Sequence, residues 1–498
     1  MALIQITDLT FTYPGSFDPV FEHVSFQLDT DWRLGLTGRN GRGKTTLLHL
    51  LQGQYPHQGT ITAPGGFEYF PYPIPDAALT PLELLECSFP DVPQWRLRRE
   101  LAPLFVTDDA LYRPFSTLSG GEQVKILLAL LFAREGRYLL IDEPTNHLDE
   151  TGRALVSRYL AKKSGFLLVS HDRAFLDGCV DHILSINRGG IEVQKGNFSS
   201  WYENRQRQDA FELAQNAQLK KEIGRLKQAA RQSRAWADKV ENTKIGPHSA
   251  KVTGEADAMG GRAYIGEQSR RMQQRRKNLE RRQNAAIEEK SALLKNIEQA
   301  APLKLHQLPY HTDRLALLRD VSVCYGGAPV CRGVSFCVEQ GDRIALRGAN
   351  GTGKTSLLRL LCGEDVPHTG TVERSSRLRI SYVRQDPSGL RGDLGAYAAR
   401  YGLDESLFKA ILRKLDFARV QFEKDMADFS AGQKKKVLLA RSLCEPSHLL
   451  VWDEPLNYVD VLSRMQIEDL LLEFQPTIVF VEHDRVFCDH VATKAVML

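Results

Sequence analysis

Two copies of one phosphate-binding pattern occur in the sequence. GRNGRGKT occupies residues 38–45 and GANGTGKT occupies residues 348–355, and both fit GxxxxGK[ST]. Glycines in this spacing let successive backbone N–H groups curl around a phosphate, while the lysine supplies a point charge and the hydroxyl a magnesium ligand. The predicted phosphate-binding residues are Gly38, Arg39, Asn40, Gly41, Arg42, Gly43, Lys44, Thr45 and Thr46, and Gly348, Ala349, Asn350, Gly351, Thr352, Gly353, Lys354, Thr355 and Ser356. The pattern therefore predicts two nucleoside triphosphate sites.

An acidic pair follows an apolar run downstream of each copy, in YLLIDEP and LLVWDEP. Asp142 and Asp453 would hold magnesium together with the hydroxyls of Thr45 and Thr355. Glu143 and Glu454 would orient and polarise the attacking water as catalytic residues. The alternative is that these carboxylates only cap the next helix.

A histidine ends a second apolar run in each half, in GFLLVSHD and TIVFVEHD. His171 and His483 are therefore predicted at the same sheet edge, as sensors of the γ-phosphate and members of the catalytic set. The alternative is a surface histidine without such a role.

The motifs recur at a nearly constant offset, which indicates two homologous domains. The phosphate loops differ by 310 positions, the DEP acids by 311, and His171 and His483 by 312. Short apolar runs alternate with helical stretches, which favours a mostly parallel sheet flanked by helices. We therefore predict an α/β fold with two tandem P-loop domains. Residues 1–204 form the first domain, 205–300 an interdomain linker and 301–498 the second domain.

Composition narrows the class of protein. The chain has 498 residues, of which 42% are hydrophobic and 25% charged, so it can form ordinary cores. Neither a secretory signal nor an apolar run long enough to span a bilayer is apparent, so we expect a soluble, cytoplasmic protein without a membrane partner. The 8 cysteines include no CxxC pair, and Cys324, Cys331 and Cys337 fit no usual zinc spacing, so reduced structural thiols are expected.

TLSGGEQVK, with the motifs above, closely resembles the signature of ATP-binding cassette proteins. The resemblance implies head-to-tail pairing of the two halves, so that each ATP lies between the phosphate loop of one half and the signature of the other. Tyr13 and Tyr325 match the aromatic residue that stacks on adenine. The signature residues that this assigns to ATP are Ser119, Gly120 and Gly121, and Ser430, Ala431 and Gly432.

The resemblance fails at two positions. Gln385 matches the family's glutamine and joins the implied magnesium ligands, whereas the first half has Tyr72 at that place. The second signature reads FSAGQ, with Ala431 in place of a glycine. Under head-to-tail pairing, the phosphate loop that contains Lys44 and the second signature form one composite ATP site. Both departures, Tyr72 and Ala431, then fall in this Lys44 site. We therefore hypothesise that the Lys354 site hydrolyses ATP faster and that the Lys44 site is slower and more structural.

The linker is basic and helical. Residues 205–300 hold 21 Lys and Arg against 12 Asp and Glu, an excess of nine in a chain of net charge +4. Apolar residues at Leu219, Ile223, Leu226 and Ala230, and again at Met272, Leu279, Ala286 and Leu293, predict two helices that pair as an antiparallel coiled coil. The basic faces favour a phosphate backbone, with RNA as the natural candidate. The alternative is a solvated spacer.

DEPTNHLD and DEPLNYVD, in tandem cassettes without a membrane span, resemble the ABC-F family. LTGRNGRGKTTLL, RPFSTLSGGE, RQDAFELAQN and ISYVRQD resemble the Lsa-type antibiotic-resistance proteins of that family. This resemblance implies an ATPase using ATP and Mg²⁺, monomeric with intramolecular cassette pairing. It would bind the ribosomal exit site, meeting large-subunit ribosomal RNA and transfer RNA, and confer resistance to lincosamides, pleuromutilins and streptogramin A.

A glycine-rich loop at about residues 243–268 is predicted to join the two linker helices and to reach the partner. It offers charge for phosphates and aromatic or thioether groups for bases. The candidate ribosome-contacting residues are Lys244, His248, Lys251, Met259, Arg262 and Tyr264.

Two other functions remain open at this point. A housekeeping ABC-F translation factor acting on stalled ribosomes would share the same motifs. An ATPase subunit of a drug exporter would need a membrane partner that the sequence does not reveal.

Overall fold

The computed structural model describes residues 2–15, 19–146, 148–187, 190–244, 281, 305, 307–325 and 328–498. Contacts divide the chain into two units. Met1–Trp201 and Ala300–Leu498 form one compact unit, and Tyr202–Gln299 form the other. The compact unit holds both copies of the repeated motifs, so the sites below belong to one body of the protein.

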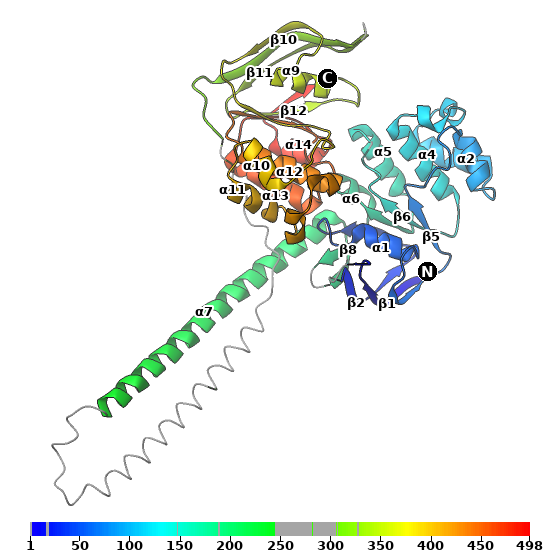
Figure 1. Ribbon diagram of the computed structural model, residues 1–498. Helices are drawn as coiled ribbons and strands as arrows, with labels where there is room; N and C mark the ends of the chain where they lie inside the picture. Colours follow the sequence, from blue (N-terminus) through cyan, green and yellow to red (C-terminus); the bar gives the residue numbers. More distant parts are fainter. Residues whose placement is uncertain are drawn as a thin grey trace, which may run out of the picture. The chain divides into compact units, whose positions relative to one another are not determined.

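The first cassette contains a six-stranded sheet in the order β5-β6-β7-β3-β8-β9 (Figure 1). Every neighbouring pair in it is parallel except β8 and β9. A separate antiparallel sheet has the order β2-β1-β4. The elements are β1 (Leu3–Phe11), β2 (Phe21–Asp29), β3 (Arg33–Thr37), α1 (Lys44–Leu51), β4 (Gln58–Thr62), β5 (Phe67–Phe70), α2 (Pro81–Ser88), α3 (Gln94–Leu101), α4 (Gly120–Ala133), β6 (Tyr138–Asp142), α5 (Glu150–Leu160), β7 (Phe166–Val169), α6 (Arg173–Cys179), β8 (His182–Asn187) and β9 (Gly190–Lys195).

The second cassette repeats this plan. Its five-stranded parallel sheet has the order β14-β15-β16-β12-β17, and its antiparallel sheet the order β11-β10-β13. The elements are β10 (Arg314–Tyr325), β11 (Ala328–Glu339), β12 (Arg343–Arg347), α9 (Lys354–Cys362), β13 (His368–Arg374), β14 (Ile380–Val383), α10 (Leu394–Arg400), α11 (Glu405–Lys414), α12 (Ala431–Cys444), β15 (Leu449–Asp453), α13 (Val461–Phe474), β16 (Ile478–Val481), α14 (Arg485–Val491) and β17 (Lys494–Met497).

These sheets confirm the predicted α/β class with two tandem P-loop cassettes. The sequence reading did not separate the antiparallel sheets from the parallel ones, because β1 and β10 pair with strands that follow them at different distances along the chain. β1, for example, pairs with β2 on one side and with β4 on the other.

The two signature helices, α4 and α12, begin at side-chain caps. Ser119 caps α4, where its Oγ accepts from Glu122 N, and Ser430 caps α12 in the same way through Gln433 N. Both are capping boxes, in which the third helical residue returns a side-chain acceptor to the cap. Asp149 and Asp460 cap α5 and α13. Local chemistry therefore sets where these helices start.

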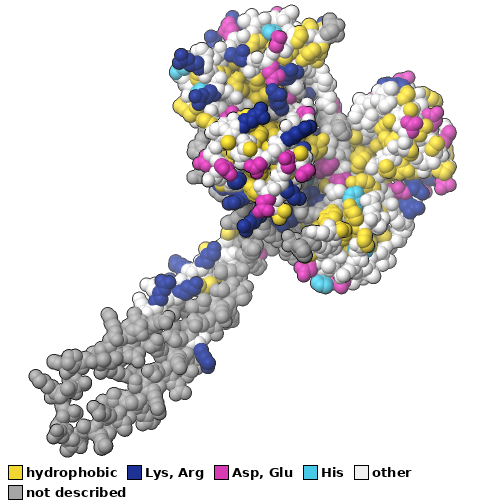
Figure 2. Space-filling view, viewed as in Figure 1, with side chains coloured by type: hydrophobic (Ala, Val, Ile, Leu, Met, Phe, Trp, Pro, Cys, Tyr) yellow, Lys and Arg dark blue, Asp and Glu magenta, His cyan; other side chains and the backbone are white. Residues whose placement is uncertain are grey.

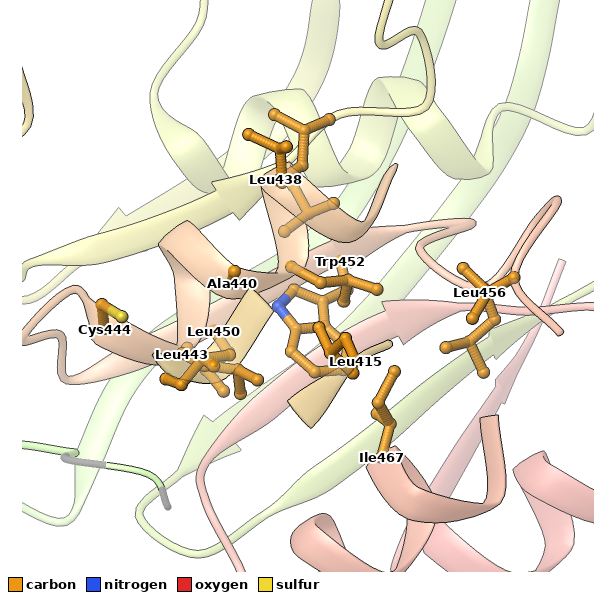
Figure 3. Packing of buried hydrophobic residues seen from close by; sticks show 14 of the residues in the cluster. Leu415, Leu438, Ala440, Leu443, Cys444, Leu450, Trp452, Leu456 and Ile467 are labelled. Atoms are coloured by element: carbon orange, nitrogen blue, oxygen red, sulfur yellow. The ribbon is translucent and has the colours of Figure 1, made fainter. Parts of the chain in front are cut away.

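The core of the second cassette surrounds Trp452 on β15. Trp452 is fully buried, and its Nε1 donates to Ser442 Oγ of α12 at 2.9 Å. Leu438 and Leu443 of α12 pack in the same cluster (Figure 3). Side chains in such cores sit at crystal-like density. The helix α12 is thereby fixed against the strand that ends in Asp453.

The first linker helix is present as α7 (Phe198–Lys244). It begins inside the segment predicted for the first cassette and extends through Thr243 and Lys244, the first two residues of the predicted loop. Neither residue breaks a helix, and the first Gly-Pro pair follows at positions 246 and 247. Ile223 is buried on α7. The rest of the predicted loop and the second linker helix, apart from Arg281, lie outside the described residues.

Candidate active site

Each phosphate loop is shaped by glycines in conformations that other residues avoid. Gly43 has φ 88° directly before α1, and Gly353 has φ 86° directly before α9. A Cβ on Gly43 would lie 2.6 Å from Val20 Cγ1, and one on Gly38 would lie 2.9 Å from Ile186 O. The loop thus needs glycine for both backbone angle and space. The following helix presents its N-terminal N–H groups to the same place.

The two loop lysines occupy equivalent positions. Lys44 Nζ donates to Gly38 O at 2.7 Å, and Lys354 Nζ donates to Gly348 O at 2.8 Å. Both side chains are buried, and burial lowers the pKa of each amine. Among the described residues, these ammonium groups donate only to uncharged oxygens of their own loops, so phosphate oxygens entering the loop would find a cation whose charge is not paired there.

The predicted magnesium ligands come together at the end of the central strands. Thr45 Oγ1 donates to Asp142 Oδ2 at 3.1 Å. In the second cassette, burial raises the pKa of Asp453 to about 6. The Thr355 hydroxyl is close enough to oppose this rise, although neither carboxylate oxygen has a hydrogen bond of good geometry among the described residues. A buried carboxylate with unused oxygens beside a threonine hydroxyl fits a hard divalent cation. Thr355 directly follows Lys354, the first residue of α9.

Glu454 is held by three side chains. Gln385 Nε2 donates to its Oε2 at 2.9 Å, Asn457 Nδ2 donates to the same oxygen at 2.6 Å, and His483 Nε2 lies 3.1 Å from its Oε1. Burial favours the neutral acid, but the His483 contact and the Gln385 hydrogen bond outweigh it and lower the pKa of Glu454 to about 2. The carboxylate is therefore ionised and held in one orientation at neutral pH, so it can accept a hydrogen bond from the attacking water and orient it.

Glu143 has different surroundings. His171 Nε2 lies 3.1 Å from its Oε1, yet burial, followed by the negative charge of Asp142, raises the pKa of Glu143. Burial also lowers the pKa of His171 well below its usual value. Burial therefore disfavours the charged form of both members of this pair. The two glutamates, equivalent in sequence, have pKa values shifted in opposite directions.

Strand register shows that Tyr72 of the first cassette is equivalent to Gln385 of the second. Phe70 pairs with Ile141 and Val383 with Trp452, so the residues two positions after Phe70 and Val383 are equivalent. The ring of Tyr72 lies 5.0 Å from that of Phe89. The described residues show no hydrogen bond from Tyr72 to Glu143. The first cassette thus has no side-chain amide at the position of Gln385.

The two predicted adenine-stacking tyrosines lie beside the phosphate-loop helices. Tyr13 Oη is 2.7 Å from Thr46 Oγ1, and Tyr325 Oη is 3.1 Å from Ser356 Oγ. Both rings are partly exposed, at 39% and 43%. An anchored hydroxyl with an open ring face suits stacking on a base.

The second signature meets the first phosphate loop. A cavity of about 260 Å³ is lined by Asn40 and Glu143 of the first cassette and by Ser430 and Gly432 of the second. Asn40 Nδ2 donates to Tyr458 O at 2.9 Å across this cavity. These residues form the head-to-tail arrangement expected for the Lys44 site, with Ala431 beside them at the start of α12.

The other composite site is less closely assembled. Ser119 Oγ donates to Glu122 within its own helix, at 2.7 Å. No hydrogen bond or ion pair in the described part of the chain joins Ser119, Gly120 or Gly121 to the Lys354 loop. The structure therefore shows direct contacts for one of the two predicted composite sites, and the described residues show no such contact between the signature and the phosphate loop of the other.

Gly432→Ala is expected to slow hydrolysis at the Lys44 site about fivefold, the loss of about one hydrogen bond. A Cβ on Gly432 would lie 2.5 Å from Tyr458 O, so that carbonyl must move away from Asn40. Single-turnover hydrolysis in a Glu454→Gln background measures this site. Gly389→Ala is the control, since its Cβ would meet nothing within 4 Å. Equal rates for the two alanine variants would contradict the prediction.

Three contacts escaped the sequence reading. Asn457 donates to Glu454, Tyr69 Oη donates to Asp142 Oδ2 at 3.1 Å, and Lys435 Nζ donates to Glu454 O at 3.0 Å. Asn457 stands three residues after Glu454 in DEPLN, a spacing that could have suggested the contact. Lys435 gave no such signal, because it sits in a run of three lysines typical of an exposed helix face.

The ABC transporter family model matches residues 21–68 and 331–457, which include both phosphate loops and the second signature. The ribosome protection protein VmlR of Bacillus subtilis is 26% identical over 503 residues, covering 99% of this chain and 87% of VmlR. The ATP-binding protein Uup of Caulobacter vibrioides is 29% identical over 496 residues, covering 96% of this chain and 75% of Uup. Over nearly its whole length the chain is similar to ABC-F type ATP-binding proteins.

Solved structures agree with the fold of two tandem cassettes. An archaeal ribosome recycling factor, aABCE1, crystallised with the ribosomal stalk protein aP1, superposes with a TM-score of 0.62 at 18% identity, covering 98% of this chain and 87% of that one. A structure of RNase-L Inhibitor gives a TM-score of 0.60 at 19% identity, with 99% and 87% covered. Family and motifs together make the chain an ATPase. Within the described residues, no helix is both long and apolar enough to cross a membrane.

Proposed function

We propose that this ABC-F ATPase is a ribosomal protection protein, conferring resistance to lincosamides, pleuromutilins and streptogramin A from the ribosomal exit site. The observation that carries the proposal is the similarity to VmlR, which extends over 99% of the chain and includes the linker. Tandem cassettes alone would fit many activities, so their presence does not select one. The similarity to VmlR also includes the linker between the cassettes.

The exposed face of α7 supports a nucleic-acid partner. Figure 2 shows Lys and Arg side chains along the described part of this helix. The exposed cations are Arg207, Lys220, Lys221, Arg225, Lys227 and Arg231. Such a basic helical face neutralises backbone phosphates without reading base edges. Ribosomal RNA and exit-site transfer RNA are partners of this chemistry. The candidate contacts His248, Lys251, Met259, Arg262 and Tyr264 lie outside the described residues, and Lys244 ends α7.

The active site supplies the energy for binding and departure. ATP would be held by the phosphate loop of one cassette and the signature of the other, so that bound ATP favours the paired state. Magnesium, held by Asp142 with Thr45 and by Asp453 with Thr355 and Gln385, would neutralise charge on the phosphates. Glu454 accepts a proton from water, and His483 keeps that carboxylate oriented. Loss of the γ-phosphate then removes the link between cassettes.

We further propose that the protein acts in the cytoplasm as a monomer whose two cassettes pair within one chain. In this proposal residues 1–204 and 301–498 are the cassettes and residues 205–300 are the linker. The single compact unit of Met1–Trp201 with Ala300–Leu498 supports pairing within one chain.

A housekeeping translation factor is the second candidate. The ATP-binding protein Uup is as similar to this chain as VmlR is, and the putative ATP-binding protein YdiF of Bacillus subtilis is 25% identical over 551 residues, covering the whole chain; neither name specifies ribosome protection. Loss of such a factor would impair growth without any drug, whereas loss of a protection protein would leave drug-free growth unchanged.

Growth of a drug-sensitive bacterium in the presence of each drug class tests the proposal. The strain would express the intact protein, a variant lacking residues 245–262, or Glu143→Gln with Glu454→Gln. We expect the intact protein to raise the inhibitory concentration of all three classes at least about fourfold. The two variants are expected to give none of this protection, because one lacks the predicted contact loop and the other cannot hydrolyse ATP.

Immunoblotting of ribosome pellets is the control for expression and binding. An inhibitor that acts away from the peptidyl-transferase centre should be unaffected in every strain. Absence of protection by well-expressed intact protein would overturn the protection proposal and favour the translation factor. Protection by the loop-deleted variant would show that the loop is not the contacting element.

A further inference from the structure

Lys435 is one of the most deeply buried side chains of the second cassette. It lies on α12, one turn after the signature, and is 1% exposed. Its Nζ donates to Glu454 O at 3.0 Å and to Arg384 O at 3.1 Å. A buried ammonium is costly unless it is hydrogen-bonded, and both acceptors here are main-chain carbonyls. The position of Lys435 therefore depends on the backbone at these two residues, and theirs on it.

Both carbonyls belong to the catalytic machinery of the Lys354 site. Glu454 has φ 47°, in the left-handed region, which for a residue with a Cβ persists only where the surroundings enforce it. Arg384 directly precedes Gln385, whose Nε2 donates to Glu454 Oε2 at 2.9 Å. One ammonium group thus holds the backbone that presents the base and the backbone that presents the amide contacting it.

The first cassette has no equivalent of this contact. Val124 occupies the corresponding position, five residues after Ser119 as Lys435 is five after Ser430. Val124 is buried at 6% exposure, and its side chain cannot donate a hydrogen bond. Glu143 nevertheless has φ 49°, the same strained conformation. The left-handed turn forms without the lysine, so the lysine's contribution lies in where that turn is held relative to Gln385.

We propose that Lys435 is a positioning residue for ATP hydrolysis at the Lys354 site, fixing Glu454 and Gln385 relative to each other through their backbone. The proposal rests on the catalytic role assigned to Glu454 above. It distinguishes the two sites by a residue outside every nucleotide-binding motif. Displacing a base by about 1 Å can cost about 100-fold in rate, so a modest movement of either carbonyl is enough to matter.

The location of Lys435 allows packing and positioning to be separated. Ser430 and Gly432, at the N-terminal end of the same helix α12, line the cavity of the Lys44 site. A change that merely loosened α12 would affect the signature and slow the Lys44 site. A change that released the two carbonyls would slow the Lys354 site. Measuring each site alone therefore distinguishes the two explanations.

The test is single-turnover ATP hydrolysis by the full-length chain carrying Lys435→Met. It is measured in a Glu143→Gln background, which reports the Lys354 site, and in a Glu454→Gln background, which reports the Lys44 site. We expect at least about a tenfold slower rate in the first background, with the half-saturating ATP concentration changed less than about threefold. In the second background the rate should change less than about threefold.

Lys434→Met is the matched control on the same helix. Lys434 is partly exposed and its Nζ donates to Ala427 O at 3.1 Å, away from the site. It should change neither rate more than about twofold. If Lys435→Met does not fold, Lys435→Gln is measured by the same comparison. Equal slowing of both sites, or an unchanged Lys354 site, would overturn the proposal. Either result can be obtained whether or not the protein protects ribosomes, since no ribosome is present.

Discussion

Glu454→Gln is expected to slow single-turnover ATP hydrolysis at least about 100-fold, whereas Glu143→Gln should slow it less than about threefold. A positioned general base contributes about 100-fold to 10,000-fold. Glu454 is ionised and held by Gln385, Asn457 and His483, with a pKa of about 2. The measurement is phosphate release from labelled ATP with enzyme in excess over nucleotide, so that each bound ATP is hydrolysed once.

The physical reason for the difference is the state of the two carboxyls before ATP binds. Burial raises the pKa of Glu143. In the first cassette, Tyr72 occupies the position of Gln385, and its ring packs on Phe89. A protonated carboxyl cannot accept a proton from water. Burial therefore works against the ionised form of Glu143, whereas the contacts of Glu454 favour its ionised form. This difference adds to the effect of Ala431, which also falls in the Lys44 site.

Glu473→Gln is the control for the same chemical change at an exposed carboxyl, and it should leave the rate unchanged. The signature half of each site must be intact in all variants, so binding of ATP is measured alongside. A larger loss with Glu143→Gln than with Glu454→Gln would reverse the assignment of the faster site.

The positions of the nucleotide-binding residues could be predicted because their motifs are local. A phosphate loop needs glycines, a lysine and a hydroxyl within eight residues, and the acids follow one apolar strand. Lys44, Thr45 and Asp142 belong to such patterns. The structure places Thr45 Oγ1 at 3.1 Å from Asp142 Oδ2. The two-cassette fold followed from the repetition of those patterns, and it is confirmed.

The difference between Glu143 and Glu454 could not be predicted from their own motifs, which read IDEP and WDEP. Their pKa values depend on side chains contributed by several elements, and on burial set by the whole cassette. The sequence shows Tyr72 and Ala431 as departures from the family pattern. It does not show against which residue Tyr72 packs. In the sequence, Lys435 resembles a surface lysine, whereas the structure places it on the inward face of α12.

Lys436→Met is expected to destabilise the second cassette by about 3–5 kcal/mol at pH 7. Lys436 is buried, and its Nζ donates to Asp460 Oδ2 at 3.0 Å and to Leu415 O at 2.7 Å. Asp460 is fully buried and caps α13 through Ser463 N. Removing the lysine leaves a buried carboxylate without its cation, which costs more than the pair itself contributes.

The ionisation of Asp460 fixes the pH range of this effect. Burial opposes its charge, but Lys436 and Lys44 outweigh burial and lower the pKa of Asp460. A carboxyl whose pKa is lower in the folded state contributes stability above its unfolded pKa, and this stability is lost as the pH falls through the folded pKa. At pH 7 the contribution is complete. Acidification should therefore narrow the difference between the variant and the parent protein.

Hydrogen exchange of α12 and β15 amides measures the loss locally, which avoids assuming that both cassettes unfold together. A loss of about 3 kcal/mol corresponds to roughly 100-fold faster exchange through opening. Lys125→Met is the matched control, because Lys125 occupies the equivalent position on α4 and is partly exposed. Its effect should stay within about 0.5 kcal/mol. Lys436→Met with Asp460→Asn should recover at least half of the lost protection, since it removes the unpaired charge. No recovery would mean that Lys436 stabilises α12 through Leu415 O and packing, and not through its pairing with Asp460.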